Sequence, residues 1–490
     1  MHPIRVFIFL VVASAPMIGA PTVGFAEKSS AVDPLAILRK ECVSCHTESK
    51  RKGGFLIDSR ESLLEGGDTG PAIVPGKAGE SYLVETLYPD ADSHMPPKGQ
   101  LDPREIAAIE EWIDAGAKWD SEHWAKLNLP EKTEVTRETM PDSYAPVASM
   151  ALSPDTKLLV AGRGNRIEWY RVTAGEGETP PLQLEHFHSS PGHSDLVQSL
   201  AFSPDGKTVA SGGFRSLRLW STKEPGKPTK TIEEPFLGRQ TALLFLDDKR
   251  LLVADSLPSQ LGRLHEITLP DGKTQSFDSA HLDSIYSLTR SQSGKHYATT
   301  SADKLITVRD SKSHEIVNRL EGHTGYVITA AFGPEDKRIA TGGDDEEIKV
   351  WNLETGKKVS AFASKRCGPL YGLEWFIDPE NQKKRAEEKD SEKAKEINTD
   401  RIFAISESGK PAAFIELNEH EGEQRSTGAR ERPFDTVETP LFAMTVHPER
   451  QWLFAGGEDG RIFVWDEKGK LKQTWEPTAP AETKLAAKDE

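Results

Sequence analysis

The sequence has little cysteine and no excess of basic charge, and each shortage excludes a class of protein. Only three cysteines occur in 490 residues, which is too few for a disulfide framework. Lysine and arginine number 61 against 77 aspartates and glutamates, which gives a formal net charge of −16. Such a chain lacks the basic surface that neutralises phosphates, so we expect no nucleic-acid partner. Its length exceeds that of one ordinary core, so two or more domains are expected.

Long apolar runs are also scarce, and the one that stands out lies at the start of the chain. A short basic stretch precedes almost wholly apolar residues from 6 to 15, and Gly24-Phe25-Ala26 offers a small-x-small cleavage site. We expect residues 1–26 to be a cleaved signal peptide, with the protein exported to the periplasm or cell envelope. The alternative is retention as a membrane anchor, for which the run is short. After cleavage we expect no membrane span.

The segment Cys42-Val43-Ser44-Cys45-His46 has the C-x-x-C-H spacing at which c-type haem is attached. Cys42 and Cys45 would form thioethers with the two vinyl groups of one porphyrin, and His46 would bind its iron. A zinc site would need two more close ligands, and the third cysteine, Cys367, is far along the chain. A thioredoxin-like redox pair would require a βαβ unit that the sequence does not show. The expected cofactor is therefore one covalently attached haem c.

The sixth ligand of such an iron must come from further along the chain, and His94-Met95-Pro96-Pro97 contains two candidates. The thioether of Met95 is a soft ligand that favours reduced iron and raises the reduction potential. The two prolines fix an extended loop without free backbone donors, which suits holding a sulfur over a haem face. His94 is the alternative distal ligand and would give bis-histidine iron of lower potential. We predict that His46 and Met95 are the axial ligands.

Two helix signals frame these motifs and predict a small all-α domain over residues 31–125. Asp33-Pro34 combines an N-cap with a proline in the first turn, so a short helix leads directly into the cysteines. Asp102-Pro103 begins a second helix in the same way, and Gly116 ends it. Apolar residues at helical spacing give the second helix one packing face: Ile106, Ile109, Trp112 and Ile113.

Short motifs between and after these signals carry a family resemblance. They are Lys52-Gly53-Gly54-Phe55-Leu56-Ile57-Asp58-Ser59-Arg60, Leu64-Glu65-Gly66-Gly67-Asp68-Thr69-Gly70-Pro71, Val74-Pro75-Gly76, Met95-Pro96-Pro97 and Trp112-Ile113-Asp114-Ala115-Gly116-Ala117. With them, residues 38–119 resemble the planctomycete-type cytochrome c domain. The resemblance implies that His46 and Met95 are the axial ligands. It also places a tight loop around Gly66-Gly67 beside the haem.

The chain then repeats itself at a spacing typical of propeller blades or solenoids. An apolar strand that ends in a turn recurs, and each copy is followed by two further strands, the last ending near Trp169, Trp220 or Trp351. Gly192-His193 precedes Trp220, and Trp465-Asp466 closes the last copy. These residues resemble the WD-repeat family. The resemblance implies structural sets of buried, hydrogen-bonded side chains: His323, Thr341, Asp345 and Trp351, and a partial set of His193, Ser211 and Trp220.

Seven repeats are counted, and they end near Trp169, Trp220, His265, Arg309, Trp351, Phe414 and Trp465. An all-β, seven-bladed WD-repeat propeller is therefore expected over residues 146–475, with a linker at 126–145 and a disordered tail at 476–490. Strands hidden in the linker would raise the count to eight. Two polar insertions, 378–400 and 418–432, are expected to be solvated loops.

These features predict an exported c-type haem protein that transfers single electrons, with the propeller as a docking platform for redox partner proteins. No catalytic constellation is recognised, which favours an electron carrier and binding scaffold over an enzyme. Two alternatives remain open. One is a haem-dependent oxidoreductase that uses the propeller as a second active-site domain. The other is a haem-sensing or scaffolding protein.

Overall fold

The computed structural model describes residues 32–43, 45–46, 52–97, 99–127, 145–174, 182–258, 261–277, 279, 281–363, 368–377, 383–384, 387, 400–415 and 430–476. The chain divides into two compact units, Met1–Asn128 and Leu129–Glu490. The predicted signal peptide, Cys367 and the predicted tail beyond Glu476 lie outside the described residues, as does most of the predicted linker. Within the described ranges, no helix has the length and apolarity needed to cross a membrane.

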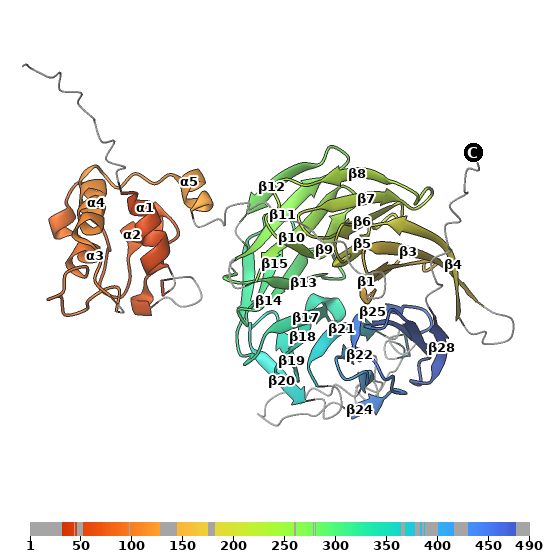
Figure 1. Cartoon of the computed structure of the whole chain (residues 1–490). Coiled ribbons are helices and arrows are strands. Elements are labelled where there is room, and N and C mark those ends of the chain that lie inside the picture. The colour runs from red at the N-terminus through yellow and green to blue at the C-terminus, as the bar shows by residue number, and fades with distance from the viewer. Residues whose placement is uncertain are drawn as a thin grey trace, which may run out of the picture. The chain divides into compact units, whose positions relative to one another are not determined.

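The N-terminal unit consists of short helices and turns around one apolar core. Its helices are α1(Pro34–Ile37), η1(Leu38–Cys42), η2(Lys52–Gly54), α2(Arg60–Glu65), η3(Ala78–Glu80), α3(Tyr82–Glu85), α4(Pro103–Asp114) and α5(Ser121–Lys126), as labelled in part in Figure 1. The helix η1 is a π-helical turn that continues α1 and ends at Cys42. Leu38, Leu63, Ile109 and Ile113 are fully buried, so α4 packs its apolar face inward as its spacing predicts.

Both predicted helix starts are confirmed by their capping contacts. The Asp33 carboxylate accepts a hydrogen bond from the Leu35 amide at 3.0 Å, and Pro34 occupies the first turn of α1. Asp102 and Glu105 form a reciprocal capping box at the start of α4. At the other end of α4, Gly116 adopts a φ of 93°, a conformation that glycine reaches without strain. Local sequence signals therefore fix where the haem motif and the closing helix begin.

The C-terminal unit is a ring of seven four-stranded antiparallel sheets in the described part of the chain (Figure 1), which confirms the seven-bladed propeller. Its first four blades are β1(Val147–Leu152), β2(Leu158–Arg163), β3(Arg166–Ala174), β4(Leu182–Pro191); β5(Ser199–Phe202), β6(Thr208–Gly212), β7(Leu217–Ser221), β8(Pro228–Ile232); β9(Arg239–Asp247), β10(Arg250–Leu257), β11(Leu261–Thr268), β12(Lys273–Phe277); and β13(Ile285–Arg290), β14(His296–Ser301), β15(Ile306–Asp310), β16(Ile316–Leu320). The last three are β17(Val327–Phe332), β18(Arg338–Gly343), β19(Glu347–Asn352), β20(Lys358–Ala363); β21(Leu370–Ile377), β22(Asp400–Ser406), β23(Ala412–Ile415), β24(Arg430–Pro433); and β25(Leu441–His447), β26(Trp452–Gly457), β27(Ile462–Trp465), β28(Leu471–Trp475). Every blade consists of four strands that are consecutive in the sequence. The last blade therefore takes no strand from the start of the propeller.

Every predicted repeat end lies in the third strand of its blade. These residues are Trp169, Trp220, His265, Arg309, Trp351, Phe414 and Trp465 in β3, β7, β11, β15, β19, β23 and β27. The ring closes where the first blade packs on the last, and Val147 and Phe454 share one buried cluster. A Cβ at Gly456 would lie 2.2 Å from Val147 Cγ1, so glycine is required for this approach.

The predicted side-chain set of the fifth blade is confirmed. The Thr341 hydroxyl accepts a hydrogen bond from Trp351 Nε1 at 2.8 Å and donates to His323 Nε2 at 2.8 Å. His323 Nδ1 in turn donates to Asp345 at 2.9 Å. Lys349, which is 2% exposed, forms an ion pair with the same carboxylate at 2.7 Å. In the second blade, the partial set is also confirmed, because Ser211 bonds both His193 and Trp220.

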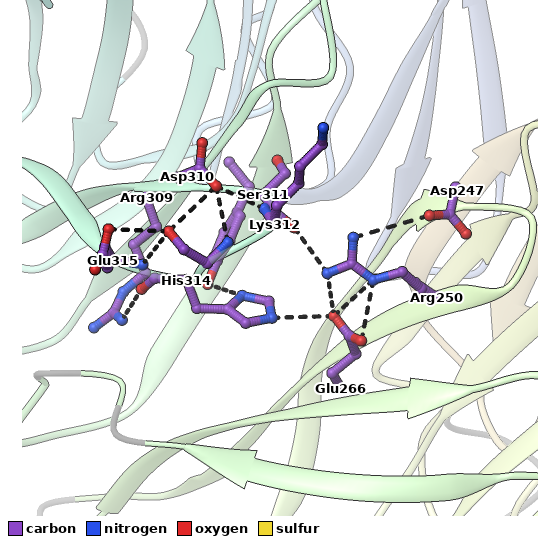
Figure 2. Close-up of polar contacts among 11 residues, drawn as sticks. Asp247, Arg250, Glu266, Arg309, Asp310, Ser311, Lys312, His314 and Glu315 are labelled. Atoms are coloured by element: carbon purple, nitrogen blue, oxygen red, sulfur yellow. Dashed lines mark hydrogen bonds and ion pairs between the residues drawn. The ribbon is translucent and has the colours of Figure 1, made fainter.

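A polar network joins the third and fourth blades, where the sequence has Arg309 in place of a repeat tryptophan (Figure 2). Arg250 holds Glu266 through two nitrogens and donates to the Ser311 carbonyl at 2.8 Å. His314 bridges the blades, because its Nε2 lies 3.1 Å from Glu266 Oε2. Arg309 donates to the His314 carbonyl at 2.7 Å. Arg309 therefore binds the turn that carries His314 and does not replace the contact that a repeat tryptophan makes.

Candidate functional site

The main cavity of the N-terminal unit is lined by all four residues that the sequence analysis assigned to haem. Cys42, Cys45, His46 and Met95 border one cavity of about 340 Å³. This volume lies within the range of about 300–1,000 Å³ that is usual for small-molecule and cofactor sites. Apolar side chains complete much of its wall: Phe55 and Ile57, which belong to a quoted family motif, and Ala72, Leu83 and Leu87, which the sequence analysis did not single out.

Local folding brings the C-x-x-C-H motif to the cavity. The π-helical turn η1 ends at Cys42, and the amide of His46 bonds back to the carbonyls of Cys42 and Val43 at 3.2 and 3.1 Å. The ring of His46 packs on Phe55, with 5.1 Å between ring centroids. Its Nδ1 is buried without a hydrogen-bond partner among the described residues, and burial lowers the pKa of His46. The imidazole is therefore neutral at pH 7, the form in which it binds a metal.

Burial also sets the state of the first thiol. It raises the pKa of Cys42 to about 12, with Glu41 and Cys45 adding to the effect. A thiol that stays protonated at neutral pH is a poor nucleophile for disulfide exchange and a poor zinc ligand. The described residues of the whole chain contain no group of three or more histidine, cysteine or acidic side chains placed to hold a metal ion. The environment of Cys42 thus differs from that of a redox-active C-x-x-C pair.

Met95 and His94 are neighbours in sequence, yet they face different surroundings. Met95 lines the cavity, and its amide donates to the Thr86 carbonyl at 2.7 Å, which ties this loop to the end of α3. His94 is held elsewhere, because its Nε2 lies 3.0 Å from Gln100 Oε1. Gln100 is itself fixed by its bond to the Leu87 carbonyl at 2.8 Å. This geometry favours Met95 over His94 as the second side chain that could bind an iron beside His46.

The glycine-rich loop borders the same cavity, as the family resemblance implies. Gly67, Asp68 and Gly70 are among the lining residues. The Asp68 amide donates to the Gly53 carbonyl at 2.8 Å, so two glycine-containing turns lie directly against each other. A Cβ at Gly67 would come within 2.3 Å of the Gly53 oxygen. Glycine is therefore required at position 67 for the two turns to approach each other at this edge of the cavity.

These residues fit one c-type haem. Two thiols and an imidazole come from one turn, a thioether comes from a separate loop, and apolar side chains fill the wall between them. A soft sulfur donor and a neutral imidazole suit iron, and an apolar wall excludes water from a porphyrin. The buried Nδ1 of His46 is a polar atom that the described residues leave without a partner.

The propeller has a second cavity, of about 510 Å³, along its axis. Its wall comes from the innermost strands, among them β1, β13, β21 and β25. One carboxylate, Glu374, lies on this wall and accepts a hydrogen bond from the Val446 amide at 2.9 Å. Removal from bulk water raises the pKa of Glu374 to about 7. The sequence analysis did not identify this residue, since an acidic residue inside an apolar strand carries no motif.

Aromatic side chains that the sequence analysis also missed gather at one end of this channel. Tyr286, Tyr371 and Phe442 line it, and Tyr326 lies beside Tyr286 with 6.3 Å between ring centroids. A repeat alignment contains the signal, because three of these residues follow the buried first residue of an innermost strand: Ile285, Leu370 and Leu441. Their clustering is a property of the closed ring.

Comparison with known proteins assigns the two parts to different families. Residues 42–99 match the family model described as Planctomycete cytochrome C. Residues 184–221, 314–352 and 435–466 match the WD domain, G-beta repeat. Both matches agree with the resemblances that the sequence shows.

Curated relatives match the chain at low identity. WD repeat-containing protein 1 of Gallus gallus is 23% identical over 297 residues, which cover 56% of this chain and 48% of the relative. Apoptotic protease-activating factor 1 of Rattus norvegicus is 28% identical over 223 residues, covering 44% and 17%. Protein groucho of Drosophila melanogaster is 24% identical over 170 residues, covering 34% and 23%. The chain thus spans less than half of each of these relatives. The chain joins a segment that matches the Planctomycete cytochrome C model, residues 42–99, to a seven-bladed propeller in which three segments match the WD40 repeat.

Proposed function

We propose that this chain is an exported c-type haem protein that transfers single electrons, and that its propeller docks the redox partner proteins. One observation carries the first part. The two thiols, the imidazole and the thioether expected for haem attachment and iron binding all line one cavity, although Met95 is 49 residues from His46 in the sequence (95 − 46).

In this proposal, Cys42 and Cys45 would hold one haem through thioethers, and His46 and Met95 would bind its iron. The haem, when bound, supplies a reversible one-electron iron couple. The chain's own residues hold this centre in place. Phe55 packs on the His46 ring and fixes its orientation, and the Thr86 carbonyl anchors the loop of Met95. With His46 and Met95 both bound to it, the iron would exchange electrons and would not bind a substrate.

The propeller is the proposed docking platform. Its seven-bladed ring presents loops from every blade around a central channel, an arrangement that suits protein recognition. One of the relatives reported above is named as a WD repeat-containing protein, and three segments of this chain match the WD repeat model. We place the protein in the periplasm or cell envelope, because a basic start, an apolar run and a cleavage motif occupy residues 1–26. The covalent attachment of haem suits the same compartment.

The test is an absorption spectrum of the exported protein, oxidised and reduced, with two neighbouring variants. Met95→Ala should abolish the far-red sulfur-to-iron band, because it removes the thioether. His94→Ala is the matched control and should leave that band intact, because His94 is bonded to Gln100. Absence of the band from the unmodified protein, with a spectral change in His94→Ala and none in Met95→Ala, would reverse the ligand assignment. A protein without covalently bound haem, or with five-coordinate iron that turns over a substrate, would overturn the proposal.

A further inference from the structure

Four aromatic side chains, here called the aromatic rim, surround one mouth of the propeller channel: Tyr286, Tyr326, Tyr371 and Phe442. They form two pairs. Tyr286 and Tyr326 lie 6.3 Å apart between ring centroids, and Tyr371 and Phe442 lie 5.7 Å apart, edge to face. Tyr326 is 48% exposed, so it presents much of its ring to solvent. The rim therefore offers aromatic faces at the entrance of a cavity of about 510 Å³.

The backbone explains why these rings point to the mouth. The pairing register shifts between Ile285 and Ser287 in β13, between Leu370 and Gly372 in β21, and between Leu441 and Ala443 in β25. Each shift falls on the aromatic residue itself. Such a bulge bends a strand and redirects the side chain of the extra residue. The same irregularity in three blades thus turns Tyr286, Tyr371 and Phe442 toward one mouth.

Carboxylates accompany the rim. Asp344 is close enough to both Tyr286 and Tyr371 to raise the pKa of each phenol, after the larger effect of burial. Asp283 acts in the same way on Tyr286, and Glu407 on Tyr371. The Asp344 amide donates to the Tyr326 carbonyl at 3.0 Å, which places that turn beside the rim. Asp344 and Glu407 are solvent-exposed. Negative charge and aromatic faces therefore meet at the same opening.

We infer that the aromatic rim binds a partner-protein segment through a lysine or arginine side chain inserted at the channel mouth. A cation is attracted to the face of a tyrosine ring and to a carboxylate, and both are present here. The net charge of −16 favours the approach of a basic partner. An acidic or purely apolar segment would lack one or both of these attractions. This inference rests on the docking role proposed for the propeller, and it specifies the chemistry of the partner.

The probe is a fluorescently labelled decalysine peptide, with a decaglutamate peptide as its opposite. Binding to the full chain is followed by fluorescence anisotropy at low and physiological salt. Asp344→Asn/Glu407→Gln removes two charges from the rim. The matched control, Glu185→Gln/Glu354→Gln, removes two exposed charges from β4 and from the turn after β19, away from the channel. Tyr326→Leu removes an aromatic face and keeps apolar bulk, with Val317→Ala as the control for an exposed apolar side chain.

We expect decalysine to bind and decaglutamate not to bind. The rim double variant should weaken decalysine binding by about five- to tenfold, and the control double variant by less than about twofold. Tyr326→Leu should weaken it by about two- to fivefold. Equal losses in both double variants would mean attraction by overall charge only and would overturn the inference, as would unchanged binding in the rim variants. The haem spectrum of each protein is recorded beside these titrations. Failure of the unmodified chain to bind decalysine, together with an intact haem spectrum, would overturn the inference and leave the electron-transfer proposal standing.

Discussion

Replacing Glu374 with glutamine should stabilise the propeller at pH 8 and leave its stability nearly unchanged at pH 4. The pKa of this carboxyl rises from 4.5 to about 7 in the folded chain, because the channel wall removes it from bulk water. The folded state therefore binds the proton more tightly than the unfolded chain does. Stability from this group is fully present below pH 4.5 and is lost as the pH rises toward 7.

The structure sets the size of the effect and the choice of substitution. The difference between 4.5 and about 7 corresponds to at most about 3 kcal/mol of destabilisation when the carboxylate is ionised. Among the described residues, no basic group forms an ion pair with Glu374 that would offset this cost. Its carboxylate accepts a hydrogen bond from the Val446 amide, and the amide oxygen of glutamine can accept the same bond. The substitution therefore removes the charge and keeps both volume and contact.

Urea unfolding of the full chain, followed by tryptophan fluorescence at pH 4, 6 and 8, measures the effect. The gain in the unfolding free energy of Glu374→Gln should grow between pH 4 and pH 8. Glu185→Gln, at an exposed site on β4, is the control and should show no such trend. An equal gain or loss at every pH would refute the reasoning, because it would show that the Glu374 carboxyl titrates as it does in water.

Three further substitutions test the architecture. Thr341→Val should destabilise the propeller by about 2–5 kcal/mol in urea unfolding, because it leaves Trp351 Nε1 and His323 Nε2 buried without partners; a loss below 1 kcal/mol would contradict the role given to this hydroxyl. Gly456→Ala should destabilise the propeller by about 1–3 kcal/mol through overpacking and so lower its melting temperature. Gly226→Ala is the control and should leave the melting temperature unchanged, because the nearest atom to its added Cβ lies 3.9 Å away. Equal shifts in the two variants would contradict tight closure of the ring. Asp102→Ala should cost the N-terminal unit about 1 kcal/mol in thermal unfolding followed by helical circular dichroism, because α4 loses its cap.

Short-range signals in the sequence predicted much of the architecture. Asp33 and Asp102 mark helix starts because the capping bond joins residues two positions apart. Repeat ends such as Trp220 and Trp465 mark third strands because each blade is a local unit of consecutive strands. Even Arg309, which stands where other repeats have tryptophan, is correctly predicted as a repeat end. These features depend on neighbours in sequence, so a single sequence is enough to reveal them.

The haem candidates were only partly determined by the sequence. The spacing of Cys42, Cys45 and His46 depends on one turn and is readable directly. The adjacent His94 and Met95 are both plausible ligands by chemistry, and no local rule separates them. Their surroundings differ because Gln100 binds His94 and the Thr86 carbonyl holds the loop that turns Met95 toward the cavity. Such contacts join parts of the chain that only the packing of the unit brings together.

The sequence by itself therefore determined the helix starts, the blade pattern and the C-x-x-C-H motif of this protein. The tertiary structure decided which side chains share a space. The aromatic rim needs β13, β21 and β25 in one closed ring, and the raised pKa of Glu374 needs the channel wall around it. The physical reason is one of range. Capping, strand alternation and turn formation act between residues a few positions apart, whereas burial and convergence depend on segments that meet only after the chain has folded.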